Sequence, residues 1–240
     1  MDEAREYAKH HGGLEAVATL LRENHLRLDQ VLLLGDVFSS QHIGNRAAFL
    51  DNARAFFRDA QILGATTVVA CSTFGETDLS LAPTLFAELC DIAQPYGIRL
   101  SLEFIGWAKI INNLRTAWDI VEKAGRENGG ILYDTFHHFF GGTPMADLEA
   151  VPTRYIFAVH IVDANPMPLS TLEISRKHRV FPGKGVIPIP DILRVLNGKG
   201  YNGSIALEIF NEAYWQRPPR ELASEGYEVM LRIVSEAGFA

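Results

Sequence analysis

The stretch "ILYDTFHHFFGG" (residues 131–142) decides how the fold is interpreted. Its first residues, Ile-Leu-Tyr, are typical of a buried strand. The run then ends in Asp134, and after Thr135 and Phe136 come two histidines, two phenylalanines and two glycines. A carboxylate and an imidazole at the end of a buried strand indicate a functional site at that position.

Short apolar runs of this kind occur six times, and patterns with a helical period of 3.6 residues separate them. The expected strands are residues 30–38, 66–74, 98–106, 130–137, 156–164 and 204–211. The expected helices are residues 13–25, 46–64, 81–97, 113–125 and 219–237. Near-continuous apolar strands that alternate with amphipathic helices predict a parallel sheet covered by helices.

Both a doubly wound open sheet and a (β/α) barrel fit this alternation. A Rossmann sheet would carry G-x-G-x-x-G after an early strand, and the sequence has none. The segments "GKGVIP" (183–188) and "NGKGYNG" (197–203) lack the spacing of a Walker loop, so we interpret their glycines as turn residues. Charged residues late in four strands favour a barrel, because the strand ends of a barrel converge on one mouth. These residues are Glu103, Asp134, His160 and Glu208.

Composition limits the function. The 240 residues are 48% hydrophobic and contain no linker-like segment, so we expect one domain over residues 1–240. A net charge of −7 without a Lys/Arg run argues against nucleic-acid and membrane partners. The chain has no apolar signal segment, and Cys71 and Cys90 are interpreted as buried thiols in a reducing cytosol, so we expect a cytoplasmic location.

Three carboxylates that converge in a partly buried mouth would repel one another and lose their hydration. A divalent cation removes both difficulties, and three oxygen donors with one imidazole suit Mn²⁺, Mg²⁺ or Co²⁺, with Zn²⁺ and Fe²⁺ also compatible. A single strand-end carboxylate usually caps a loop or forms an ion pair, and a single histidine is usually part of the core. Four such residues on four strands favour one bound metal ion.

From about residue 14 to the C-terminus the chain resembles the xylose isomerase-like TIM barrels, a family of sugar isomerases and epimerases, and most nearly its inosose isomerase (2-keto-myo-inositol isomerase) branch. The segments that carry this resemblance are "LSLEFIG" (100–106), "ILYDTFHHFFGG" (131–142), "AVHIVDA" (158–164), "RVFPGKGVIPIPDIL" (179–193) and "IALEIFNEAYW" (205–215).

The resemblance implies a TIM-type (β/α) barrel and gives the candidate residues specific roles. It makes Glu103, Asp134, His160 and Glu208 the metal ligands, with the two glutamates as the catalytic acid/base pair. It implies that His137, Arg179 and Asp163 lie at the substrate. His138 should point the other way, and we expect it to pack or to make a supporting hydrogen bond.

Aromatic side chains near the strand ends are candidates for the pocket wall. Trp107 is the best of them, because it follows the strand of Glu103 and an indole packs well on a sugar face. The others are more often core residues: Phe38, Phe74, Phe104, Phe139 and Phe140.

Such a site suits proton transfer next to a ketone through a metal-bound cis-enediolate. The leading hypothesis is therefore a metal-dependent isomerase or epimerase of an inosose or keto sugar. A dehydratase on the same barrel, such as a dehydroshikimate or inosose dehydratase, would use the same ligands.

The sequence differs from the family in one respect. Only six strands are recognisable, and the first two βα units of the barrel have no counterpart in these residues. The start could lie upstream, another subunit could cover the open edges in a homodimer, or the protein could bind metal and sugar without catalysis.

Overall fold

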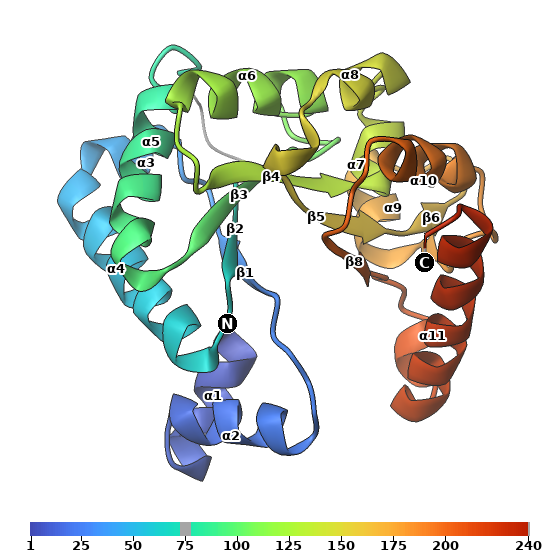
Figure 1. Cartoon of the computed structure of the whole chain (residues 1–240), viewed down its shortest axis with the longest axis horizontal. Helices are drawn as coiled ribbons and strands as arrows, with labels where there is room; N and C mark the ends of the chain where they lie inside the picture. The colour runs from blue at the N-terminus through green and yellow to red at the C-terminus, as the bar shows by residue number, and fades with distance from the viewer. Residues whose placement is uncertain (73–77, 240) are drawn as a thin grey trace. The chain divides into compact units, whose positions relative to one another are not determined.

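The computed structural model describes residues 1–72 and 78–239. The chain divides into two compact units. Unit 1 comprises Met1–Glu103 and Ala117–Ile131, and unit 2 comprises Phe104–Thr116 and Leu132–Ala240. Figure 1 gives the order of the elements along the chain.

Unit 1 is built on three parallel strands that pair in chain order. They are β1 (Gln30–Leu34), β2 (Thr67–Cys71) and β3 (Arg99–Glu103). Strand β2 is buried along its whole length, as is all of β3 after its first residue. Burial on both faces explains why these strands are near-continuously apolar, without the alternation of a half-exposed strand.

Helices cover the strands of unit 1 (Figure 1). The longest is α4 (Arg46–Leu63), whose buried side chains form the predicted apolar stripe, and Gly64 ends it with a left-handed φ of 80°. Helix α6 starts in unit 2 and ends in unit 1. The bounds are α1 (Asp2–His11), α2 (Leu14–Glu23), α3 (Ser40–Gly44), α4 (Arg46–Leu63), α5 (Ala82–Ala93), η1 (Gln94–Tyr96) and α6 (Leu114–Ala124).

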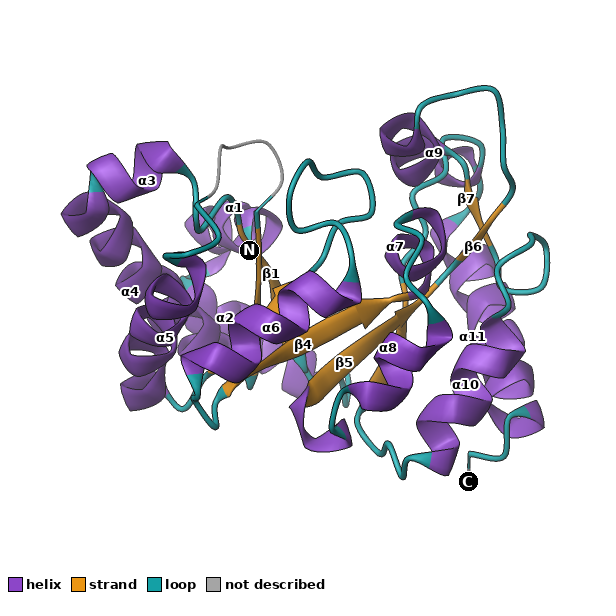
Figure 2. Ribbon diagram, turned by 90° about the horizontal axis from the view of Figure 1, so that it is seen from above, coloured by secondary structure: helices purple, strands orange, loops and turns teal. Residues whose placement is uncertain are grey.

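Unit 2 contains the end of β4 (Gly129–Asp134), the parallel pair β5 (Ile156–Ile161) and β8 (Ser204–Leu207), and a short antiparallel ribbon. The ribbon pairs β6 (Asp163–Ala164) with β7 (Arg179–Val180), and helices α7 (Thr135–Phe140) and α9 (Thr171–Lys177) lie beside it (Figure 2). The helices are α7 (Thr135–Phe140), α8 (Met145–Ala150), η2 (Thr153–Tyr155), α9 (Thr171–Lys177), α10 (Ile189–Gly198), η3 (Tyr214–Gln216) and α11 (Pro219–Glu236).

All six predicted strands are present, and each is shorter than expected. The end of the strand expected over 66–74, with Phe74, lies outside the described residues. Gly183 and Gly200 have positive φ angles of 84° and 72°, which confirms that these two glycines belong to turns. Gly198 was expected in a turn as well, but it is the last residue of helix α10. In the described parts of the chain, no helix combines the length and the apolar character needed to cross a membrane.

The strand expected over 130–137 is wrong at its end. It stops at Asp134, whose side chain accepts hydrogen bonds from the backbone N–H of Phe136 (2.6 Å) and of His137 (3.2 Å). Asp134 thus caps helix α7, and His137 and His138 lie on a helix instead of a strand.

The core of unit 1 gives a testable prediction. Leu89 of α5 is fully buried, whereas Leu26 of the same unit is 59% exposed. Leu89→Ala should lower the free energy of unfolding by about 2–5 kcal/mol, because it leaves a cavity. Leu26→Ala should change it by less than about 0.5 kcal/mol. Urea unfolding followed by circular dichroism measures both, and equal losses would contradict the burial described here.

Candidate metal and substrate site

Three of the predicted ligands meet in unit 2, at the carboxyl ends of their strands. Asp134 is the last residue of β4, His160 is next to last in β5, and Glu208 follows β8 directly. Each offers a ligand atom that lies within 4.8 Å of those of the other two. Nδ1 of His160 lies 3.6 Å from Oε2 of Glu208.

The guanidinium of Arg179 joins the two carboxylates of this group. Its Nη1 donates to Oδ2 of Asp134 at 3.1 Å and to Oε2 of Glu208 at 3.0 Å. The side chains of Asp134 and Arg179 are 0% and 3% exposed, and that of Glu208 is 21% exposed. Charges this deeply buried require such partners, because an uncompensated buried charge is strongly destabilising.

Ser175 and two aromatic rings fix the position of the Arg179 guanidinium. Its Nε donates to the carbonyl oxygen of Ser175 at 2.8 Å, and its Nη2 donates to Oγ of the same serine at 3.0 Å. The guanidinium also lies over the rings of Phe136 and Phe210, with its central carbon 4.8 and 5.2 Å from the ring centroids. The sequence analysis did not identify Ser175. Its position four residues before Arg179, near the end of α9, could have indicated that the two side chains lie close together.

These contacts keep both carboxylates ionised. Burial alone would raise the pKa of Asp134, but the charge of Arg179 and the hydrogen bond from the backbone N–H of His137 hold it below its usual range. Burial likewise opposes ionisation of Glu208, and its contact with His160 and the charge of Arg179 lower its pKa nonetheless. Both residues are therefore carboxylates at neutral pH.

The donor set fits a divalent cation. Two carboxylates face one guanidinium, so one negative charge in the group is not compensated. Carboxylate oxygens together with an imidazole nitrogen suit Mn²⁺, Co²⁺, Zn²⁺ and Fe²⁺, and the carboxylates alone suit Mg²⁺.

His137 is buried on α7, where the backbone N–H of Gly106 donates to its Nδ1 at 3.1 Å. Its other ring nitrogen, Nε2, lies 3.5 Å from Nη2 of Arg179, a group that can only donate. Burial lowers the pKa of His137 to about 4. The ring therefore stays neutral at physiological pH.

Asp163, expected near the substrate, is 1% exposed, and its carboxylate accepts hydrogen bonds from four backbone N–H groups. One oxygen accepts from the N–H groups of Ala164 (2.9 Å) and Ile187 (3.0 Å). The other accepts from Gly183 and Gly185, both at 2.9 Å. These bonds fix the segment that follows β7, and β7 carries Arg179.

The remaining candidates occupy different environments. Glu103, the last residue of β3, is buried in unit 1. Trp107 is half-buried in unit 2, and Arg176 lies over its ring. Phe38 and Phe104 are fully buried and belong to the core.

His138 lies on the same helix as His137 and packs against Tyr133, with ring centroids 5.4 Å apart. Its Nδ1 and the hydroxyl of Tyr133 are buried and have no hydrogen-bond partner among the described residues. Burial lowers the pKa of His138 to about 4. His138 therefore acts as a packing residue, as the sequence suggested.

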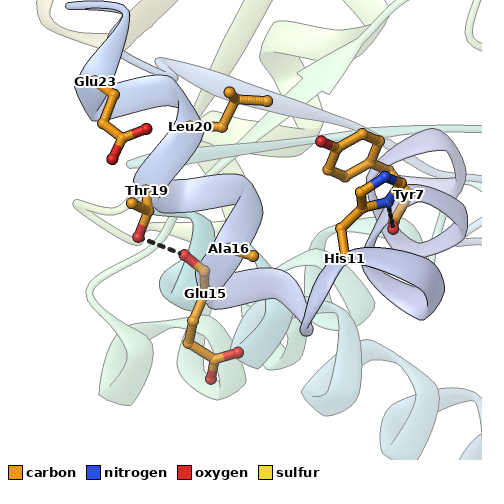
Figure 3. Close-up of a pocket in the computed structure, with 7 residues that line it drawn as sticks. All are labelled: Tyr7, His11, Glu15, Ala16, Thr19, Leu20 and Glu23. Atoms are coloured by element: carbon orange, nitrogen blue, oxygen red, sulfur yellow. Dashed lines mark hydrogen bonds between the residues drawn. The ribbon is translucent and has the colours of Figure 1, made fainter.

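A separate pocket lies between α1 and α2 in unit 1 (Figure 3). Its histidine, His11, stacks on Tyr7 with a centroid separation of 3.7 Å, and His11 Nδ1 lies 2.8 Å from the carbonyl oxygen of Tyr7. The hydroxyl of Thr19 donates to the carbonyl oxygen of Glu15 at 2.9 Å. Each of these hydrogen bonds joins residues of a single helix, and we assign this pocket no role.

Comparison with known proteins gives a consistent result. The family model described as "Xylose isomerase-like TIM barrel" matches residues 2–233. The inosose isomerase of Halalkalibacterium halodurans is 28% identical over 98% of this chain and 85% of its own. The 3-dehydroshikimate dehydratase of Pseudomonas aeruginosa is 33% identical over 76% of this chain, which corresponds to 29% of that longer protein.

Among solved structures, the IOLI protein with a bound zinc atom has a TM-score of 0.89 and 25% identity, over 99% of this chain and 86% of its own. An L-ribulose 3-epimerase has a TM-score of 0.71 at 18% identity, over 93% of this chain and 80% of its own. These similarities confirm the TIM-type (β/α) barrel fold that the sequence predicted.

The contacts of Asp163 predict a large effect of a small change. Asp163→Asn replaces one acceptor oxygen with a donor that faces two N–H groups, so it should cost about 3 kcal/mol of unfolding free energy. Amide hydrogen exchange at Gly183, Gly185 and Ile187 should accelerate. Asp191→Asn is the control, because Asp191 is exposed and pairs with exposed Arg194, and it should cost less than about 1 kcal/mol. Unchanged exchange in Asp163→Asn would contradict the assignment.

The depressed pKa of His138 predicts a loss of stability in acid. The unfolded chain binds a proton near pH 6.5 and the folded chain only near pH 4. His138 therefore lowers the free energy of unfolding as the pH falls through this window, by about 1.4 kcal/mol per pH unit. His138→Phe should remove this contribution, whereas the exposed control His10→Phe should not. Urea midpoints between pH 7.5 and 4.5 measure it, and an unchanged slope in His138→Phe would count against a buried neutral ring.

Proposed function

The chain belongs to the xylose isomerase-like TIM barrel family, and on that premise we propose that it is a divalent-metal-dependent isomerase or epimerase of an inosose or keto sugar. The observation that carries this proposal is the convergence of Asp134, His160 and Glu208 at three strand ends. The related proteins support it, since they include inosose isomerases and sugar epimerases.

We propose that Glu103, Asp134, His160 and Glu208 hold one divalent cation, Mn²⁺, Mg²⁺, Co²⁺ or Zn²⁺. Glu103 joins the other three on sequence grounds, since it ends β3 as Asp134 ends β4. The zinc atom bound to the IOLI protein supports a metal in this family. The proposal includes the sequence expectation that residues 1–240 act as one domain.

A bound divalent cation would supply Lewis acidity to the carbonyl and neighbouring hydroxyl oxygens of the substrate. Glu103 and Glu208 then serve as acid and base, one taking the proton from the carbon beside the carbonyl and the other returning one. Return to the opposite face of the same carbon gives an epimer, and return to the neighbouring carbon gives an isomer.

The other residues orient the substrate. His137, whose Nε2 lies 3.5 Å from Nη2 of Arg179, contacts the substrate beside that arginine. Arg179 contributes to substrate binding by its charge and by holding Asp134 and Glu208 in place. Trp107 packs against a face of the sugar. Asp163 contributes to substrate binding by fixing the segment after β7.

A dehydratase is the second candidate, supported by a shorter match at higher identity. The dehydroshikimate dehydratase of P. aeruginosa is 33% identical over 76% of this chain, and the isomerase of H. halodurans is 28% identical over 98% of it. The same ligands and the same proton abstraction would serve loss of a β-hydroxyl group. A homodimer and a cytoplasmic location stay predictions from the sequence.

Deuterium uptake tests the proposal. In D₂O with Mn²⁺, the protein should exchange a proton beside the carbonyl of an inosose or ketohexose, as followed by NMR, and EDTA should stop the exchange. Glu103→Gln and Glu208→Gln should each lower the exchange rate by about 10²–10⁴-fold, because each removes an acid/base group. Glu212→Gln is the matched control, since Glu212 is exposed and pairs with Lys177 at 3.2 Å.

The outcomes separate the candidates. An isomer or epimer as product supports the leading proposal, and loss of water from 3-dehydroshikimate supports the dehydratase. Protein that holds its metal but exchanges no proton on any of these compounds would contradict both and favour binding without catalysis. Full activity in Glu208→Gln would remove Glu208 from the acid/base pair.

A further inference from the structure

Arg176, on α9, presents a guanidinium on an aromatic surface of unit 2. The central carbon of this group lies 5.8 Å from the ring centroid of Trp107 and 5.9 Å from that of Phe210. These distances are within the range of cation–π attraction. The side chain is exposed, so its N–H groups are open to solvent and to a ligand.

The same aromatic surface leads to the proposed catalytic centre. The ring of Phe210 also contacts Arg179, whose guanidinium carbon lies 5.2 Å from its centroid. Arg179 in turn donates to Asp134 and Glu208. Arg176 is thus separated from the carboxylate group by one aromatic ring and one arginine.

Arg176 differs from the cations around it in having no acidic partner. Lys177 pairs with Glu212 at 3.2 Å, Lys184 pairs with Glu225 at 2.8 Å, and Arg179 pairs with two carboxylates. In the described part of the chain, the structure gives Arg176 ring contacts but no ion pair. Aromatic faces offset part of the charge and provide no strong acceptor for the five N–H donors of a guanidinium.

We propose that Arg176 binds an anionic group of the substrate, a carboxylate or a phosphate, and so makes an anionic keto sugar or cyclic keto acid the preferred substrate class. A guanidinium matches the two oxygens of such a group with parallel N–H donors. The rings of Trp107 and Phe210 hold it near the required position, which reduces the entropy lost on binding. This inference rests on the proposed function and narrows its substrate.

The experiment compares neutral and anionic ketones on the unchanged protein and its variants. D-fructose and 2-keto-myo-inositol are the neutral compounds, D-fructose 6-phosphate carries the phosphate, and 3-dehydroshikimate carries the carboxylate. Arg176→Gln removes the positive charge. Arg176→Lys keeps the charge but lacks the parallel N–H donors of a guanidinium. Lys177→Gln is the matched control, an adjacent exposed cation that already has a carboxylate partner. Titration calorimetry with Mn²⁺ present measures binding, and turnover is followed separately.

Arg176→Gln should weaken binding of one anionic compound by about ten- to a hundred-fold relative to a neutral one. Arg176→Lys should restore part of this selectivity, and Lys177→Gln should keep the selectivity of the unchanged protein. If the weakened compound is D-fructose 6-phosphate, the anionic group is a phosphate, and if it is 3-dehydroshikimate, the group is a carboxylate.

The calorimetric binding measurements test the role of Arg176 even if the protein turns over none of the compounds. If no compound is turned over, the proposed function fails, while selective loss of anion binding in Arg176→Gln still supports the role of Arg176. Equal affinities of the unchanged protein and Arg176→Gln for both anionic compounds would overturn the inference. An equal loss for neutral and anionic compounds would overturn it as well, since Arg176 would then act by packing alone.

Discussion

The contact of Arg179 with two buried carboxylates is the interaction on which the rest of the site depends. Asp134 and Glu208 lie close enough to share a single guanidinium nitrogen, and without that charge they would repel each other in a region largely closed to water. Arg179 is itself anchored by Ser175, and the segment that follows its strand is fixed by Asp163. Two sets of hydrogen bonds therefore hold this region, one between Arg179 and its partners and one between Asp163 and the loop after β7.

Much of this arrangement could be predicted because charged residues interrupt apolar strands at defined places. The sequence indicated that Asp134, His160 and Glu208 would meet, and their ligand atoms lie within 4.8 Å of one another. That prediction needed only the rule that parallel strands bring their carboxyl ends to one edge. The six strands and the turn glycines could be predicted on equally local grounds.

Other features left no periodic signal. Helix α7 begins directly after a strand, and its residues, Thr-Phe-His-His-Phe-Phe, are as compatible with a strand as with a helix, so only the capping bonds of Asp134 reveal it. The four bonds of Asp163 join residues up to 24 positions apart in the sequence. Gly185 is needed beside it, since an added Cβ would lie 2.3 Å from an Asp163 oxygen, but a lone glycine in a loop does not indicate such a neighbour.

The two carboxylate oxygens of Asp134 have different partners, and this has a consequence for protein engineering. One of its oxygens accepts hydrogen bonds from the backbone N–H groups at the start of α7, and the other accepts a hydrogen bond from the guanidinium of Arg179. A designer who transplants this centre to another scaffold must therefore carry over the start of a helix together with the side chain. A glutamate in its place would reach about one methylene too far to serve both ends, so the choice between two chemically similar acids is made here by backbone geometry.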